Sequence, residues 1–230
     1  MASDNTKELT EQSLGDHVVN ILKAGINGIP VLGGVVGSLM GDYIPKQKDK
    51  RIAEAINFLE SKVNSLGEKL DKEYLFSEEF VYIFEKTLRG IMVSYQEYKI
   101  YCYKGISTNS LIRKDVSQYE KEYYLYLLDG LTELHLKLLS FLNNPKEYYG
   151  LYKLDENRIS GMGFGGVIEY TFNGTPLEVV KNCYSDLYKM GFTNTEASIF
   201  GTSTAARGLD IIKGRISQVG TKFIEFCTKY

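Results

Sequence analysis

Apolar residues recur every three or four positions over residues 46–70, while Lys, Glu and Asn fill the positions between them. This period is typical of a helix that buries one face. A second stripe follows Ser77, which we predict to cap a helix with Glu78 and Glu79 in its favourable first turn. The apolar positions of the two stripes are Ile52, Ile56, Leu59, Val63, Leu66 and Leu70, followed by Phe80, Phe84, Leu88, Ile91, Tyr95, Tyr98 and Cys102.

A third helical region covers residues 119–142, with a predicted break near Asp129 and Gly130. Asn143, Asn144 and Pro145 end it firmly. The polar segment 107–118 is expected to be a connection between helices. Because long stripes with short polar links are typical of neighbouring antiparallel helices, we predict an α-helical bundle over residues 1–142.

The pattern changes after residue 142. Residues 167–172 are β-branched and aromatic between glycines, which favours a strand. A helix is predicted over residues 176–190, ended by Gly191, and it is followed by a Thr-, Ser- and Gly-rich stretch and a closing helix with Phe223, Phe226 and Cys227 inward. This order predicts a winged-helix-like α+β domain over residues 143–230, with a polar hairpin as its wing. The predicted fold class is therefore mainly α.

Residues 24–41 carry no charge, and six of these eighteen residues are glycine. Gly33, Gly37 and Gly41 recur every four residues, so on a helix they line one face and permit close backbone approach. We interpret this segment as a contact within the bundle or between copies of the chain. A membrane-inserting element is the alternative, although the stretch lies at the lower limit of a membrane-spanning length.

The few cysteines and histidines of the chain exclude most enzyme classes. The three cysteines, Cys102, Cys183 and Cys227, lie far apart, and the two histidines have no metal ligand at useful spacing. His135 lies among leucines and is interpreted as a core or helix-surface histidine. Gly161 to Gly166 match G-x-G-x-x-G, but the polar residues before them and the predicted strand after them favour a glycine loop over a nucleotide site. We expect no enzyme activity, no metal, no cofactor and no small-molecule substrate.

The chain has 18 Tyr and no Trp. The tyrosines between Tyr95 and Tyr126 stand among mixed charges, so packing in the core or in an oligomer interface is favoured over stacking on nucleic acid bases. The polar, acidic first residues differ from a secretory signal peptide, and we expect a cytoplasmic protein, with a peripheral position at the inner membrane as an extension of the membrane alternative.

Bulk charge does not favour nucleic acid binding, since 27 Lys and Arg against 29 Asp and Glu give a net charge of −2. Residues 176–190 occupy the recognition-helix position of the predicted winged helix, and their charges cancel. DNA remains a possible partner. The candidate phosphate contacts are Lys181, Lys189, Arg207, Lys213 and Arg215.

Several stretches carry a family resemblance: GIPVLGGVVGSLMGDYIPKQKDKRIAEAINFL, the SEEF entry to the second long helix, LTELHLKLLSFLNNP, and the ending LYKMGF with ISQVGTKFIEFC. Together they resemble small bacterial and prophage-encoded proteins grouped with abortive-infection alpha proteins. The resemblance implies an α-rich protein with a winged-helix-like C-terminus that is associated with defence against phage or with mobile elements.

The sequence therefore predicts a non-enzymatic phage-defence or phage-associated protein that acts through self-association, as a homo-oligomer, and through a protein partner. Two alternatives stay open. One is a winged-helix transcriptional regulator that binds DNA, and the other is a membrane-perturbing effector that uses residues 24–41.

Overall fold

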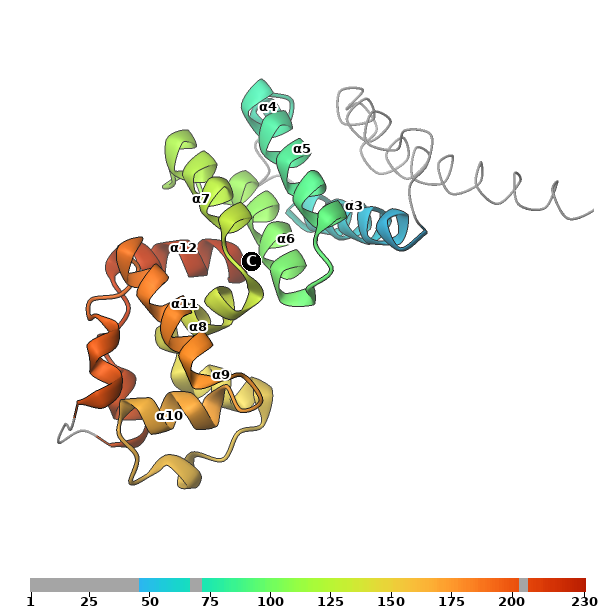
Figure 1. The fold of residues 1–230 in the computed structure, drawn as a ribbon. Helices are drawn as coiled ribbons and strands as arrows, with labels where there is room; N and C mark the ends of the chain where they lie inside the picture. Colours follow the sequence, from blue (N-terminus) through green and yellow to red (C-terminus); the bar gives the residue numbers. More distant parts are fainter. Residues whose placement is uncertain (1–45, 67–71, 203–206) are drawn as a thin grey trace, which may run out of the picture. The chain divides into compact units, whose positions relative to one another are not determined.

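The computed structural model describes residues 46–66, 72–202 and 207–230, and these are mainly helical (Figure 1). The glycine-rich segment 24–41, with Gly33, Gly37 and Gly41, lies outside the described residues. The chain forms two compact units. Unit 1 consists of Met1–Gly130 and Cys227–Tyr230, and unit 2 of Leu131–Phe226. The domain boundary expected at residue 142 stays a prediction.

The described part of unit 1 is a helical bundle, in which α5 packs against α3, α6 and α7. Its helices are α3 (Lys46–Leu66), α4 (Lys72–Leu75), α5 (Glu78–Val93), α6 (Glu97–Ile112) and α7 (Gln118–Gly130). The predicted cap of the second stripe is confirmed, because the Ser77 hydroxyl accepts a hydrogen bond from the Phe80 amide at 3.2 Å.

The second stripe forms two helices instead of one, because the chain is extended between Val93 and Glu97. Arg51 stabilises this break, since its Nη1 donates to the Ser94 carbonyl at 2.6 Å. Gly90 lies against the ring of Tyr103 from α6, where any Cβ would overlap the ring. The glycine therefore allows α5 and α6 to approach closely after the break.

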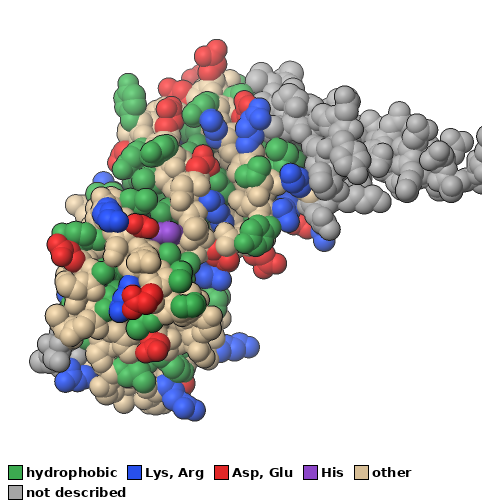
Figure 2. Space-filling view, in the orientation of Figure 1, with side chains coloured by type: hydrophobic (Ala, Val, Ile, Leu, Met, Phe, Trp, Pro, Cys, Tyr) green, Lys and Arg blue, Asp and Glu red, His purple; other side chains and the backbone are tan. Residues whose placement is uncertain are grey.

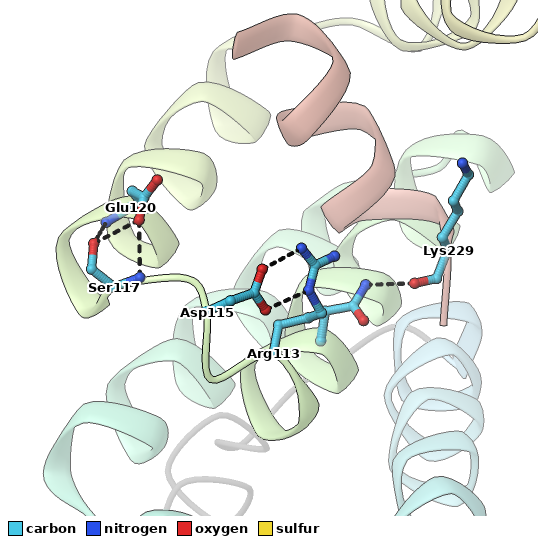
Figure 3. Close-up of polar contacts among 6 residues, drawn as sticks. Arg113, Asp115, Ser117, Glu120 and Lys229 are labelled. Atoms are coloured by element: carbon cyan, nitrogen blue, oxygen red, sulfur yellow. Dashed lines mark hydrogen bonds and ion pairs between the residues drawn. The ribbon is translucent and has the colours of Figure 1, made fainter. Parts of the chain in front are cut away.

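The prediction of a connection over residues 107–118 is wrong for residues 107–112, which form the last part of α6. Thr108, Asn109 and Ser110 are buried there with hydrogen-bond partners for their side chains, whereas the buried Ser107 hydroxyl has no partner among the described residues. The Thr108 and Ser110 hydroxyls donate to carbonyls one turn earlier, at 2.9 and 2.7 Å. Asn109 Nδ2 donates to the Lys229 carbonyl at 3.0 Å, so it holds the C-terminal residues against α6 (Figure 3).

Unit 2 is also built from helices within its described residues. They are α8 (Glu133–Asn143), α9 (Pro145–Tyr152), η2 (Glu156–Ile159), α10 (Phe164–Thr171), α11 (Leu177–Lys189), η3 (Ala197–Gly201), η4 (Gly208–Ile212) and α12 (Gln218–Thr228), of which the last two residues belong to unit 1. The predicted break after Gly130 and the end near Asn144 are confirmed, and Pro145 opens α9. The helix after Pro176 is confirmed as α11, and Gly191 follows it with the positive φ of 75° that a glycine tolerates best.

The strand predicted over residues 167–172 is wrong, because this run belongs to α10. Phe164, Val167, Ile168 and Thr171 are buried at helical spacing, and the Thr171 hydroxyl donates to the Val167 carbonyl at 2.7 Å. A short apolar run fits a buried helix and a strand equally well, so the β-branched and aromatic residues between glycines did not decide between them. The predicted hairpin is also absent from the described residues 193–202 and 207–216, which hold η3, η4 and the single antiparallel bridge between Thr193 and Ile216.

The close approach of the chain end to α6 predicts a large effect of Gly105→Ala. A Cβ at Gly105 would overlap the backbone carbonyl of Cys227, which cannot move aside cheaply. We expect a loss of about 1–3 kcal/mol in the free energy of unfolding, measured by urea denaturation. Gly130→Ala is the matched control: a Cβ there meets nothing within 4 Å, so a change of less than about 1 kcal/mol is expected. Equal stability of the two variants would contradict this packing.

Candidate interaction surface

Helix α7 presents three tyrosines on its outer side. Tyr119, Tyr123 and Tyr126 are 87%, 48% and 72% exposed and follow one another at steps of four and three. We call these three residues the α7 tyrosine face. The rings of Tyr123 and Tyr126 are stacked with their centroids 6.4 Å apart. Figure 2 shows hydrophobic and acidic side chains together over the region where α7 lies in Figure 1.

The inner side of α7 fixes which tyrosines face outward. Tyr124, Leu125 and Leu128 are buried there. Lys121 is also buried, with only 6% of its surface exposed, and its Nζ donates to the Tyr74 hydroxyl and to the Ser110 carbonyl, each at 3.1 Å. The same ammonium lies 4.2 Å from the centre of the Tyr74 ring. Burial lowers the pKa of Lys121, and burial followed by the charges of Glu79 and Glu122 raises the pKa of Tyr74 to about 12.

Both ends of α7 are held by hydrogen bonds. At its start, the Glu120 carboxylate accepts from the Ser117 amide at 3.0 Å, while the Ser117 hydroxyl accepts from the Glu120 amide at 3.3 Å (Figure 3). At its end, the Asp129 carboxylate accepts from the Tyr103 hydroxyl at 2.6 Å, and Lys99 Nζ donates to the Asp129 carbonyl at 3.0 Å. Burial, and then this bond to Asp129, raises the pKa of Tyr103. The tyrosine face thus stands on a rigid helix.

The sequence alone did not separate the exposed tyrosines from the buried ones. Tyr123 and Tyr124 are adjacent, yet the first is half exposed and the second is buried. The signal was present in the helical period: Tyr124 falls with Leu125, Leu128 and Lys121, and the face falls on the opposite side. Lys121 hides that signal, because a lysine normally marks an outward position.

Three of the five candidate DNA contacts lie beside carboxylates in unit 2. Lys181 pairs with Glu178 at 2.7 Å, Lys189 with Asp186 at 3.2 Å and Lys213 with Asp210 at 2.6 Å. Arg215 Nε donates to the Ile211 carbonyl at 3.1 Å, and Arg207 is exposed just before η4. The structure therefore neutralises the three lysines locally instead of presenting them as a basic surface.

His135 is part of a helix cap. It occupies the third position of α8, where its Nδ1 accepts a hydrogen bond from the Thr132 amide at 3.2 Å and lies 2.7 Å from the Thr132 hydroxyl. Its Nε2 lies 3.8 Å from an Asp186 carboxylate oxygen. In the described part of the chain, no three His, Cys, Asp or Glu side chains are grouped to hold a metal ion.

The G-x-G-x-x-G segment also has a packing role. Helix α10 begins inside it at Phe164, so the expected glycine loop is partly helical, and the element before it is the short helix η2 in place of a strand. A Cβ on Gly165 would lie 2.6 Å from the Phe200 carbonyl oxygen of η3. The glycine therefore lets α10 pack against η3.

Comparison with known proteins returned no matching family model, no matching curated protein and no matching solved structure. Among residues 46–66, 72–202 and 207–230, no helix has both the length and the hydropathy to cross a membrane.

The partial burial of Tyr74, together with the charges of Glu79 and Glu122, predicts a specific pH dependence. The pKa of Tyr74 is about 12 in the folded chain against an ordinary value of 10, so folding favours its neutral form. The stabilisation that the neutral Tyr74 hydroxyl contributes is complete below pH 10 and is lost between pH 10 and about 12. We expect the free energy of unfolding to fall less steeply above pH 10 in Tyr74→Phe than in the unchanged chain, measured by urea denaturation. Tyr82→Phe, at an exposed position, is the control, and the same slope in Tyr74→Phe as in this control would show that burial and the neighbouring carboxylates do not raise the pKa of Tyr74.

Proposed function

We propose that this chain is a non-enzymatic phage-defence protein that acts through self-association and partner binding. The observation that carries the proposal is the α7 tyrosine face. Tyrosine is enriched in protein interfaces because its ring buries a large apolar area while its hydroxyl keeps a hydrogen-bonding group. Here three such rings stand on one helix whose inner side and both ends are held by hydrogen bonds. A rigid surface of this kind loses little conformational entropy when a partner binds.

The role in phage defence draws on the resemblance to abortive-infection alpha proteins. One of its stretches, LTELHLKLLSFLNNP, begins just before α8 and ends at the first residue of α9. Self-association through Gly33, Gly37 and Gly41 stays a prediction, as does a membrane role for residues 24–41.

For unit 2 we propose a winged-helix-like domain with a reduced wing. Helix α11 is followed by the Thr193–Ile216 bridge and then by α12, which is the order of a recognition helix, a wing and a closing helix. Two backbone hydrogen bonds support the bridge: Asn194 N to Arg215 O at 2.8 Å, and Ser217 N to Phe192 O at 2.9 Å.

DNA binding is the second candidate function, and it rests on this helix order. The charges of the unit favour a protein partner instead, because Lys181, Lys189 and Lys213 each have a carboxylate within 3.2 Å. A protein that binds DNA gains affinity from the phosphates that its cations neutralise. Cations already paired with carboxylates on their own surface contribute less to that gain.

The tyrosine face predicts a loss of protection when its rings are removed. At least one phage of a diverse panel should form plaques with reduced efficiency on bacteria that carry the unchanged chain. The variant Tyr119→Ser/Tyr123→Ser/Tyr126→Ser should restore plating to within about tenfold of cells without the chain, because the interface area is gone. The variant Tyr82→Ser/Tyr95→Ser removes two exposed tyrosines of unit 1 outside α7 and should still protect.

Far-UV circular dichroism and sedimentation velocity on the purified chains accompany this assay, to show that each variant is folded and whether it associates. An unchanged chain that protects against no phage would overturn the defence role. Full protection by the folded triple variant would show that the α7 tyrosine face is not the working surface.

A further inference from the structure

The α7 tyrosine face has the spacing of a helix-pairing seam. Tyr119, Tyr123, Tyr126 and Gly130 follow one another at steps of four, three and four, which places them at alternating d and a positions of a heptad. A Cβ on Gly130 would meet nothing within 4 Å, so the seam ends in open space that can take a bulky side chain. These two features fit a second helix laid along α7.

The flank of this seam is acidic. Glu122 and Asp129 are seven residues apart, so both occupy the g position beside the tyrosines, and both are exposed. Their hydrogen-bond donors are neutral: Gln118 Nε2 donates to Glu122 at 2.9 Å, and the Tyr103 hydroxyl donates to Asp129. Lys99 lies near Asp129 and offsets part of its negative charge.

The one cation in the sequence of α7 does not balance this flank. Lys121 is turned inward, and its ammonium is occupied by Tyr74 and Ser110. The outward charged residues of α7 are therefore all carboxylates: Glu120, Glu122 and Asp129. The surface that results is aromatic along its centre and negative along its edge.

This charge pattern decides between occupants. In an antiparallel pair of two α7 helices, the g positions face each other, so Glu122 of one copy would lie near Asp129 of the other. Such like-charge contacts oppose association. The phosphates of a nucleic acid would meet the same carboxylates. A helix with Lys or Arg at its flanking positions instead places these cations beside Glu122. The guanidinium groups of its Arg residues can also stack on the tyrosine rings.

We infer that the α7 tyrosine face docks a cationic amphipathic helix of a partner protein, with apolar residues along its seam and Arg or Lys beside them. The inference rests on the proposed function, which requires a binding surface but does not specify its partner. It adds the charge and the secondary structure of that partner.

A pair of designed peptides tests this inference on the full chain. The first is a fluorescein-labelled helical peptide of about 20 residues with Leu at a and d and Arg at e and g, and the second carries Glu in place of every Arg. We expect the Arg peptide to bind about tenfold more tightly or better, measured by fluorescence anisotropy in about 50 mM NaCl. The difference should shrink in about 500 mM NaCl, because salt screens exposed charges.

Variants of the chain locate the binding site. Tyr119→Ser/Tyr126→Ser should weaken binding of the Arg peptide about tenfold or more, whereas Tyr82→Ser/Tyr95→Ser should stay within about twofold of the unchanged chain. Glu122→Arg should reverse the preference, so that the Glu peptide binds more tightly than the Arg peptide. Glu169→Arg, an exposed position on α10 of unit 2, makes the same change in net charge and should leave the preference as it was.

Three results would overturn the inference. The first is equal affinity of the chain for the two peptides at low salt. The second is tighter binding of a single-stranded DNA oligonucleotide than of the Arg peptide. The third is a chain that binds neither peptide but forms a dimer, which Tyr119→Ser/Tyr126→Ser converts to monomers. Failure of the proposed function would look different, because the unchanged chain would then protect against no phage, or the folded triple tyrosine variant would still protect cells.

Discussion

The buried ammonium of Lys121 is the constraint on which the described surface of unit 1 depends. A charged group is stable away from water only when hydrogen bonds and favourable dipoles replace its hydration. The Tyr74 hydroxyl, the Tyr74 ring and the Ser110 carbonyl provide that environment around the ammonium. Rotation of α7 by one residue would remove Lys121 from these partners. The contact therefore fixes the orientation of α7 about its own axis, and this orientation makes the three tyrosines point outward.

The end of the chain supports the same bundle from another side. Tyr230 packs against Phe58 and Tyr101, with ring centroids 5.4 and 5.1 Å away, and its hydroxyl donates to the Tyr101 carbonyl. Gly105 provides the room for this return, because a side chain there would overlap the Cys227 backbone. Cys227 is fully buried beside Cys102, and burial raises the pKa of its thiol. Residues close to the C-terminus are thus part of the unit 1 core.

Amphipathic period was sufficient to predict the long helices, because a stripe such as that of α3 fits one structure well. The period failed where a short run fits two structures, as in residues 167–172. It also failed where small polar side chains donate to backbone carbonyls inside a helix, as at Thr108 and Ser110. The candidate site was likewise predicted only in part. The sequence marked the tyrosines as packing residues, but Lys121, an inward cation, concealed the face they form.

The most direct test of the account is the accessibility of individual tyrosines in the native chain. Nitration with tetranitromethane, followed by mass spectrometry of peptides, reports each ring separately. We expect Tyr119 and Tyr126 to be nitrated early, while Tyr124 reacts only after the chain is unfolded in urea. Nitration of Tyr124 as fast as Tyr119 in the native chain would show that α7 is not held by Lys121 in this orientation, and the proposed surface would be wrong.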